Sequence, residues 1–128
     1  MTTKQLSIFL ENRIGRTKEV VEILSNAGID ILAFTIADSA EFGILRLIVS
    51  DIEKAAKQLK EAKISAIQTD VLWIPMDERI GALAEVLSKL AEGNVSIEYM
   101  YVCYSDSKPY IVIRPAQMEL DKCEQIFG

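Results

Sequence analysis

An internal repeat constrains this chain more than any other feature. Arg13-Ile14-Gly15 returns as Arg79-Ile80-Gly81, about 66 positions later. The flanking pattern recurs at the same spacing in four further matched pairs: Glu19 and Glu85, Val20 and Val86, Leu24 and Leu90, Ile31 and Ile97. Self-similarity at one spacing indicates two copies of a single structural unit. A chain of 128 residues has room for two very small domains, which we place at residues 1–69 and 70–128.

The first copy alternates between strand and helix patterns. Residues 4–11 put Leu6, Ile8 and Leu10 on one face, as in a half-buried strand. Apolar residues at helical spacing follow from residue 16, and Gly28 stands where a helix commonly ends in a left-handed residue. The remaining segments predict strands at 30–37 and 42–49 joined by a turn at 38–41, a helix over 52–59 capped by Ser50 or Asp51, and a strand at 64–67.

The second copy repeats this order, with one element missing. It predicts a strand at 71–76, a turn at 77–81, a helix ended by Gly93-Asn94, strands at 96–104 and 110–114 around a turn at 105–109, and a last helix carrying Leu120, Cys123 and Phe127. No residues remain for a fourth strand, so we expect that edge to be open, covered by another chain, or completed by residues outside this sequence. The predicted fold is α+β: two ferredoxin-like βαββαβ modules in tandem, with antiparallel sheets and the helices on one face, the second module lacking its last strand.

Composition excludes several classes of function. The net charge is −5 with both signs interspersed, so the basic patch of a nucleic-acid-binding protein is absent. No apolar run approaches the roughly 20 residues of a membrane span, and the first residues lack the pattern of a secretory signal; we expect a cytoplasmic protein. The chain contains no histidine, which removes the commonest metal ligand and the usual proton shuttle. We expect no metal and no cofactor.

The two first turns carry a family resemblance. Glu11-Asn12-Arg13-Ile14-Gly15-Arg16, followed by Gly28-Ile29-Asp30-Ile31 at the second strand, resembles the ACT domain, and Asp77-Glu78-Arg79-Ile80-Gly81 resembles it again. The likeness covers essentially the whole chain and is nearest to short tandem ACT proteins without a catalytic domain. The family's turn usually reads Asn or Asp, any residue, Pro, Gly. Here Ile14 and Ile80 replace the proline, and Glu78 replaces the amide, so the first site matches better.

The resemblance implies a regulatory protein, not an enzyme, that binds an amino acid or a similar small metabolite. A glycine at a helix start lets a carboxylate approach unpaired backbone N–H groups at the positive end of the helix. Backbone carbonyls, Asn12 or Asp30 can accept from an ammonium group. In paired ACT modules, by resemblance, the ligand lies between the first turn of one module and the second-strand start of its neighbour. The predicted ligand-binding residues are Asn12, Arg13, Ile14, Gly15, Asp30, Ile31, Glu78, Arg79, Ile80, Gly81, Ser96 and Ile97.

Each of these residues also has a purely structural explanation. Gly15 and Gly81 are typical of a tight strand-to-helix turn, and an arginine at such a turn is usually a solvated surface charge. Asp30 suits an ordinary junction before a strand. The four isoleucines, Ile14, Ile31, Ile80 and Ile97, favour a hydrophobic ligand or, equally, core positions.

Residues outside the turns carry weaker signals. Cys103 and Cys123 have no CxxC spacing and are expected to be small buried hydrophobes. The four tyrosines, Tyr99, Tyr101, Tyr104 and Tyr110, all fall in the second hairpin; core packing is the leading interpretation, and an exposed position would indicate a protein contact. Trp73 is a candidate for an interface between modules or subunits.

Three functional hypotheses follow. The leading one is a homodimeric sensor whose amino acid ligand changes its affinity for a partner enzyme or regulator. A second is an interaction module that uses its open sheet edge and binds no metabolite. A third, prompted by Arg13, is an acylphosphatase-like enzyme, although the turn is short for a phosphate loop and no matching asparagine is found. The nearest carboxylates for acid-base catalysis, Glu11 with Asp77 and Glu78, lie in turns of separate repeats.

Overall fold

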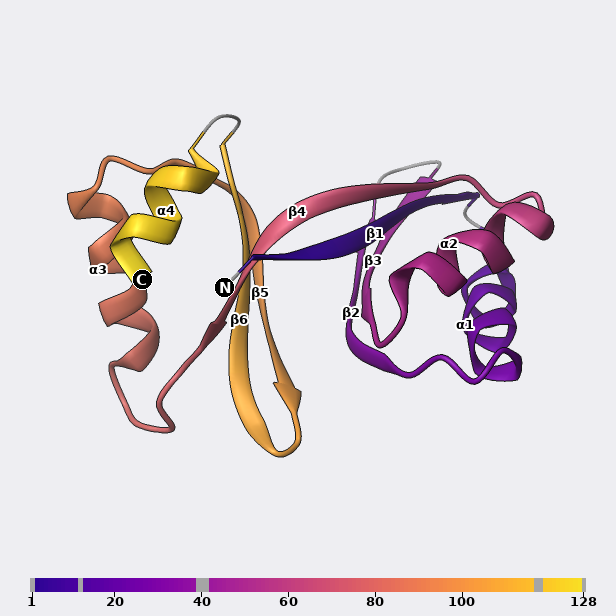
Figure 1. Ribbon diagram of the computed structural model, residues 1–128, viewed down its shortest axis with the longest axis horizontal. Helices are drawn as coiled ribbons and strands as arrows, with labels where there is room; N and C mark the ends of the chain where they lie inside the picture. The colour runs from indigo at the N-terminus through magenta and orange to yellow at the C-terminus, as the bar shows by residue number, and fades with distance from the viewer. Residues whose placement is uncertain (1, 12, 39–41, 117–118, 128) are drawn as a thin grey trace. The chain divides into compact units, whose positions relative to one another are not determined.

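The computed structural model describes residues 2–11, 13–38, 42–116 and 119–127. Strands and helices alternate along these segments in the following order: β1 (Thr2–Glu11), α1 (Arg16–Asn26), β2 (Ile31–Asp38), β3 (Phe42–Val49), α2 (Ile52–Glu61), β4 (Ala66–Pro75), α3 (Ala82–Glu92), β5 (Ile97–Ser105), β6 (Lys108–Pro115) and α4 (Leu120–Phe127). The strands are hydrogen-bonded in the order β2-β3-β1-β4-β6-β5 (Figure 1). The predicted tandem ferredoxin-like fold is therefore confirmed.

The chain divides into two compact units. The N-terminal unit is Lys4–Thr69, and the C-terminal unit is Asp70–Gly128 together with Met1–Thr3. The division falls within β4, which the sequence predicts as two strand segments at 64–67 and 71–76. In each unit, both helices lie on one face of the strands (Figure 1). Among the described residues, no helix lies on the other face of either unit.

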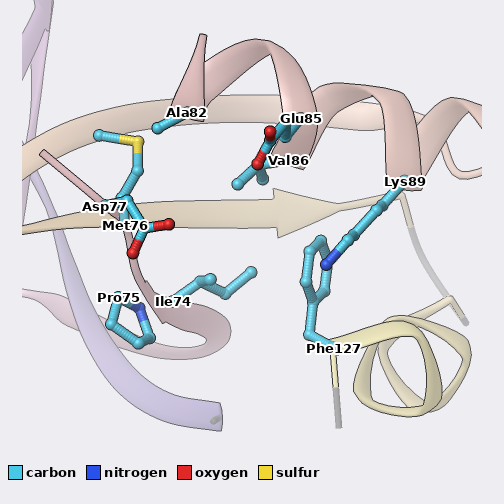
Figure 2. Close-up of a pocket in the computed structure, with 9 residues that line it drawn as sticks. All are labelled: Ile74, Pro75, Met76, Asp77, Ala82, Glu85, Val86, Lys89 and Phe127. Carbon is cyan, nitrogen blue, oxygen red and sulfur yellow. The ribbon is translucent and has the colours of Figure 1, made fainter. Parts of the chain in front are cut away.

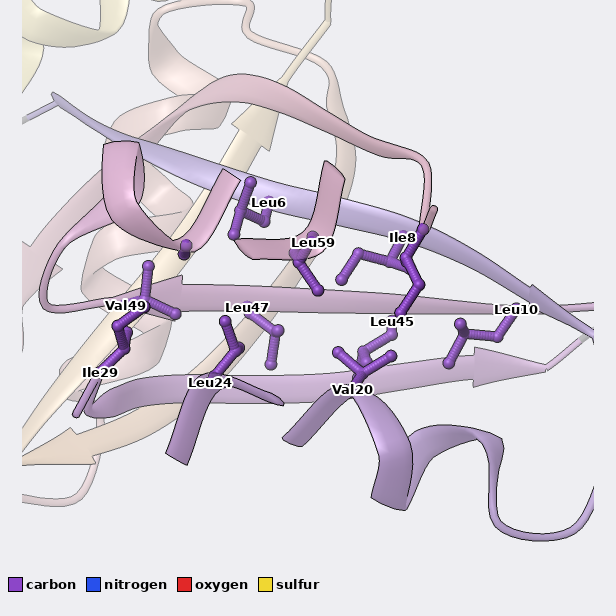
Figure 3. Packing of buried hydrophobic residues seen from close by; sticks show 12 residues of the cluster. Leu6, Ile8, Leu10, Val20, Leu24, Ile29, Leu45, Leu47, Val49 and Leu59 are labelled. Carbon is purple, nitrogen blue, oxygen red and sulfur yellow. The ribbon is translucent and has the colours of Figure 1, made fainter. Parts of the chain in front are cut away.

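The core of the N-terminal unit forms where α1 and α2 cover β1 and β3. Strand register places Leu6 opposite Leu47 and Ile8 opposite Leu45 on the helix-covered face, and all four side chains are fully buried. Val20, Leu24 and Leu59 reach this layer from the two helices (Figure 3). The period-two pattern of residues 4–11 therefore predicts the buried face of β1 correctly.

The core of the C-terminal unit has the same construction. Leu72 and Ile74 of β4 pair with Ile113 and Ile111 of β6, and the helices add Val86, Leu90 and Cys123. Cys123 is fully buried, as expected for a cysteine that acts as a small hydrophobe. Both repeats thus bury the same strand positions beneath their helices.

The edge beside β4 in the C-terminal unit was expected to be open, covered by another chain, or completed by residues outside this sequence. The structure differs from all three expectations. No strand follows α4 among the residues that the structure describes, as predicted. The start of β1, however, belongs to this unit, and the hydroxyl of Thr2 hydrogen-bonds the carboxylate of Glu124 in α4. Because β1 neighbours β4 in the strand order, its first residues take part of the place of a fourth strand.

The hairpin of the C-terminal unit is tighter than predicted. Ser105 pairs with Lys108, so only Asp106 and Ser107 form the turn, and both have positive φ, at 53° and 63°. Two left-handed residues are typical of a type I′ turn. Residues 105, 108 and 109 of the predicted turn therefore belong to strands. Of the turn predicted at 38–41, Asp38 ends β2, and residues 39–41 lie outside the described segments.

Three helices end in the same way. Gly28, Lys63 and Asn94 have positive φ, and in each case the next residue donates its N–H to a helix carbonyl five positions back, at 2.9–3.0 Å. This is the Schellman arrangement, and it confirms the predicted role of Gly28. In the second repeat Asn94, not Gly93, adopts the left-handed conformation. None of the described helices is both long and apolar enough to cross a membrane.

Candidate functional site

A tight turn precedes α1 in the N-terminal unit. The N–H of Arg16 donates to the carbonyl of Arg13 at 3.2 Å, and Gly15 has φ 85° and ψ −6°. These angles match the third residue of a type II β-turn, which requires positive φ. A Cβ on Gly15 would meet nothing within 4 Å. The backbone conformation therefore selects glycine, and the space beside it is open. Asn12 lies outside the described residues.

The same turn precedes α3 in the C-terminal unit. The N–H of Ala82 donates to the carbonyl of Arg79 at 3.2 Å, and Gly81 has φ 93° and ψ −7°. A Cβ on Gly81 would also meet nothing within 4 Å. The repeated tripeptide thus encodes a repeated turn. Proline is favoured at the second position of type II turns, and isoleucine occupies that position in both copies.

The isoleucines at the turn tips are fully exposed. Ile14 and Ile80 have relative exposures of 104% and 102%, so neither is a core residue. Ile31 and Ile97, in contrast, are half-buried and pack against the cores of their own units. Of the four predicted isoleucines, only the two at the turns present free apolar surface.

The turn arginines are exposed and form ion pairs within their own units. Arg13 lies 3.8 Å from the carboxylate of Glu19. Arg79 hydrogen-bonds Glu85 and lies 3.5 Å from Asp77; the hydrogen bond and charge of Glu85 raise the pKa of Arg79 above its usual range. Both arginines are therefore surface cations that local carboxylates largely compensate.

The helix starts beside these turns differ in charge. The first turn of α1 carries Arg16 and Lys18, whereas alanine occupies both equivalent positions in α3. The segment before α3 also contains Asp77 and Glu78. A helix N-terminus attracts anions. The added cations make the start of α1 the better place for a carboxylate, and the acidic residues oppose one at the start of α3.

Arg16 was not among the predicted site residues. Its side chain is only 24% exposed, and one terminal nitrogen lies 2.7 Å from Glu19. Its Nε is buried and has no hydrogen-bond acceptor among the residues that the structure describes. A buried donor without an acceptor is costly, so a change of side-chain conformation that exposes this Nε would let Arg16 bind a further oxygen. Comparing the two repeats position by position would have singled out this cation.

An open depression adjoins the turn of the C-terminal unit. It brings together the predicted residues Glu78, Arg79, Ile80 and Gly81. Tyr104 of β5 and Pro109 of β6 complete it, and the sequence did not indicate either as a site residue. The signal was present in the topology: β4 and β5 both run antiparallel to β6, so they end at the same end of the unit.

The second-strand starts use their backbone groups internally. The N–H of Asp30 donates to the hydroxyl of Ser50 at 2.9 Å, and the N–H of Ser50 donates to the carbonyl of Asp30 at 2.9 Å. At Ser96, the N–H lies 3.3 Å from the carboxylate of Glu119, and the carbonyl accepts from Ala116 at 2.8 Å. The Asp30 side chain itself is exposed.

The turn before α1 and the start of β2 lie at opposite ends of the N-terminal unit. In the N-terminal unit, Glu11 pairs with Phe42 at one end of β3, whereas Ile31 pairs with Val49 at the other end. The Arg13–Gly15 turn therefore lies at the end of the unit opposite to Asp30 and Ile31. A site that contains both halves has to draw them from two modules.

A match over nearly the full length identifies the family. The model of the ACT domain pair matches residues 1–126. The chain is an ACT domain pair. The resemblance read from the two turns is thereby confirmed, and it places the chain among small-molecule regulatory modules.

Solved structures agree with this assignment. Protein BT0572 from Bacteroides thetaiotaomicron is 48% identical, with a TM-score of 0.89 over 98% of this chain and 86% of that one. The ligand-free regulatory subunit of aspartate kinase from Thermus thermophilus is 15% identical, with a TM-score of 0.65 over 100% and 98%. The corresponding subunit from Thermus flavus is 17% identical, with a TM-score of 0.60 over 100% and 96%. No curated protein matches the chain.

The tyrosines of this ACT pair are not core residues. None of the four belongs to the buried cluster of the C-terminal unit or packs against it, so the leading expectation for them is wrong. Tyr104 is 66% exposed, and Tyr110 stacks on Trp73 with ring centroids 4.7 Å apart. Tyr99 and Tyr101 are half-buried. The alternation in β5 turns them away from the helix-covered face, because Met100 packs on the core.

Both cysteines of the ACT pair are free thiols. Burial raises the pKa of Cys123 above its usual range, as does the nearby Glu119. Burial also raises the pKa of Cys103, which is half-buried in β5. A raised pKa disfavours the reactive thiolate, so neither environment resembles that of a catalytic cysteine.

Proposed function

We propose that this ACT domain pair is a cytoplasmic sensor that binds an amino acid at the first turn of the N-terminal unit. The observation that carries the proposal is the turn itself: a left-handed glycine with open space beside it, directly before a helix whose first turn bears two cations. Backbone N–H groups at such a helix start, together with its dipole, favour a carboxylate.

The glycine before α1 supports this assignment for a second reason. A serine, aspartate or asparagine at that position would accept hydrogen bonds from the first helical N–H groups. Gly15 has no side chain to do so. The N–H of Arg16 donates to the turn carbonyl of Arg13, and the next N–H groups of the helix are left to a ligand. The exposed Ile14 supplies apolar contact for the body of a hydrophobic amino acid.

The two turns are not equivalent in this proposal. The N-terminal turn has Arg13, Arg16 and Lys18 against Glu11, Glu19 and Glu22, the last of which pairs with Lys18 at 2.9 Å. Its charges are therefore balanced. The C-terminal turn has one cation, Arg79, among three carboxylates. We propose that it binds more weakly, or contributes an acceptor for an ammonium group.

A site that combines a first turn with a second-strand start needs two modules, and this requirement provides a means of regulation. A site that joins a turn to Asp30 or Ser96 takes its halves from different modules, so ligand binding changes how modules associate. We propose that a homodimer provides this arrangement and that the ligand alters affinity for a separate partner enzyme, as the fold of an aspartate kinase regulatory subunit suggests. The coupling is reciprocal: the partner must change ligand affinity by the same factor.

Calorimetric titration of amino acids into the purified protein tests this site. We expect Arg16→Ala together with Lys18→Ala, which reproduces the alanines of the C-terminal turn, to weaken binding by about tenfold or more, because charge-assisted hydrogen bonds contribute roughly 1.5–3 kcal/mol. Lys54→Ala with Lys57→Ala removes the same charge from exposed positions of α2 and should leave the affinity unchanged. Equal weakening by both pairs would indicate general electrostatics and contradict the site.

A further inference from the structure

A partly open pocket of about 220 Å³ lies in the C-terminal unit, apart from the turn tip. Its walls come from the end of β4, the first turns of α3 and the end of α4. Ile74, Val86 and Phe127 face it with apolar surface, and Lys89 and Asp77 lie on opposite sides of it (Figure 2). An enclosed cavity of about 150 Å³ holds a benzene molecule, so this open pocket has room for a molecule of that size. The space therefore suits a small organic ligand.

The internal repeat explains the space beside Ala82. Ala82, which is 6% exposed, occupies the position of Arg16, whose long side chain is largely buried in the N-terminal unit. Lys89 occupies the position of Ile23, which packs on the N-terminal core. A small residue at a buried position leaves volume that a longer side chain would occupy. A neighbouring side chain that does not pack on the core adds to that volume.

The charges around the cavity are unequally compensated. Asp77 and Glu85 both pair with Arg79. The ammonium of Lys89 lies 5.9 Å from the centre of the Phe127 ring, and no carboxylate pairs with it in the part of the chain that the structure describes. The pocket thus combines apolar side chains, an aromatic face and one cation without an anionic partner. It also contains the carboxylates of Asp77 and Glu85, which pair with Arg79.

We propose that this cavity binds a small carboxylate with an apolar body. The carboxylate pairs with Lys89, and a branched or aromatic body of about five or six carbons covers Ile74, Val86 and the ring of Phe127. This site is separate from the amino acid site proposed at the N-terminal turn, since none of its residues lies in the N-terminal unit. The molecule would then have two small-molecule sites, one in each copy of the repeat.

Nuclear magnetic resonance of the full chain locates the ligand. The probe is 4-methylpentanoate, and 3-methylbutylamine is its matched control, because it has a similar body and an ammonium in place of the carboxylate. We expect saturable shifts at the methyl groups of Ile74 and Val86 with the acid only. Equal shifts with the amine, or acid-induced shifts confined to Arg13–Arg16, would overturn the inference.

Two variants separate this site from a general effect. Ala82→Arg places the sister unit's residue in the cavity and should abolish the shifts in a folded protein, while binding at the N-terminal turn is retained. Lys89→Met should weaken 4-methylpentanoate by about tenfold, the loss expected for a charge-assisted hydrogen bond. Lys122→Met, an exposed position on α4, serves as the control for charge. Unchanged affinity in Lys89→Met would contradict the assigned role of the lysine.

The same assay compares natural metabolites that carry a carboxylate on a similar apolar body. Leucine and 4-methyl-2-oxopentanoate share the apolar body and the carboxylate, and differ in an ammonium or a ketone. Shifts at Ile74 and Val86 with either molecule support the inference, and the tighter one identifies the preferred substituent. If neither molecule nor the simple acid shifts these signals at millimolar concentration, the cavity is not a carboxylate site.

Discussion

Glycine in the repeated turns illustrates how single residues shape the site. Gly15 and Gly81 both have φ near 90°, where a side chain is strained even though space for a Cβ is available. This conformation sets the direction of the turn and leaves the helix start without a side-chain cap. It also places the isoleucine before each glycine in solvent. Sequence reasoning identified these positions because glycine before a helical pattern is informative. It could not decide whether Ile14 and Ile80 were buried, since only the turn geometry settles which way they point.

Substituting Gly15 should reveal this backbone requirement. Gly15→Ala is expected to lower the free energy of unfolding by about 1 kcal/mol, because alanine is disfavoured in the left-handed region. Gly15→Asn should cost less, since asparagine tolerates this conformation better. Urea unfolding of the three proteins measures both differences. An alanine variant as stable as the parent would contradict the assigned turn.

Thiol reactivity separates the two cysteines. Burial raises the pKa of both thiols, so labelling of half-buried Cys103 should still accelerate with pH above the pKa of an ordinary cysteine. Fully buried Cys123 should react only when the unit opens. Labelling kinetics of Cys103→Ser and Cys123→Ser, from pH 7 to pH 10, measure each thiol alone. Rapid labelling of Cys123 in native protein would show that α4 is not packed as described.

At the scale of elements, the helix starts differ in whether a side chain caps them. Asp51 caps α2, and its carboxylate accepts from the N–H of Lys54 at 3.1 Å. The sequence offered Ser50 or Asp51 for this role, and the structure assigns it to Asp51, while Ser50 binds the backbone of Asp30. The helices that follow Gly15 and Gly81 have no side-chain cap. The cap on α2 is structural. At the starts of α1 and α3 there is no side-chain cap, and the N–H groups of Arg16 and Ala82 donate to the preceding turn.

The cap on α2 makes a direct stability prediction. Asp51→Ala should lower the free energy of unfolding by about 1 kcal/mol, the usual cost of removing an N-cap acceptor. Asp51→Asn retains an acceptor oxygen and should be close to neutral. Chemical denaturation of both variants provides the comparison. If alanine and asparagine destabilise equally, charge and not the cap explains the effect.

Element boundaries were predicted well wherever periodicity was strong. The strand over 4–11 and the helices after both turns follow from alternating and helical spacing. The second hairpin was misjudged, because Pro109 and its polar neighbours read as a longer loop. In the structure Pro109 is buried in β6, opposite Tyr104, and proline is tolerated near the first residues of a strand. The prediction that the tyrosines pack in the core was also wrong, because β-propensity does not reveal which face of a strand is covered.

At the scale of the whole molecule, two copies of one unit have diverged in charge and packing. Exchange of Arg16 and Lys18 for alanines removes cations from the second helix start and opens the cavity beside Ala82. Both differences are readable from the sequence once the repeats are aligned. The place of Thr2 in the C-terminal unit was not readable, because it depends on long-range strand pairing. No local pattern encodes such pairing.

Thermal unfolding with each of the twenty amino acids at millimolar concentration tests the central claim most directly. Ligand at about 100 times its dissociation constant adds roughly 2.7 kcal/mol, which is readily seen as a rise in Tm for a chain of this size. The account predicts a rise with one amino acid or a few related ones, retained in Ala82→Arg, whose cavity is filled, and reduced when Arg16 and Lys18 are alanine. No rise with any amino acid would contradict the sensor and favour an interaction module.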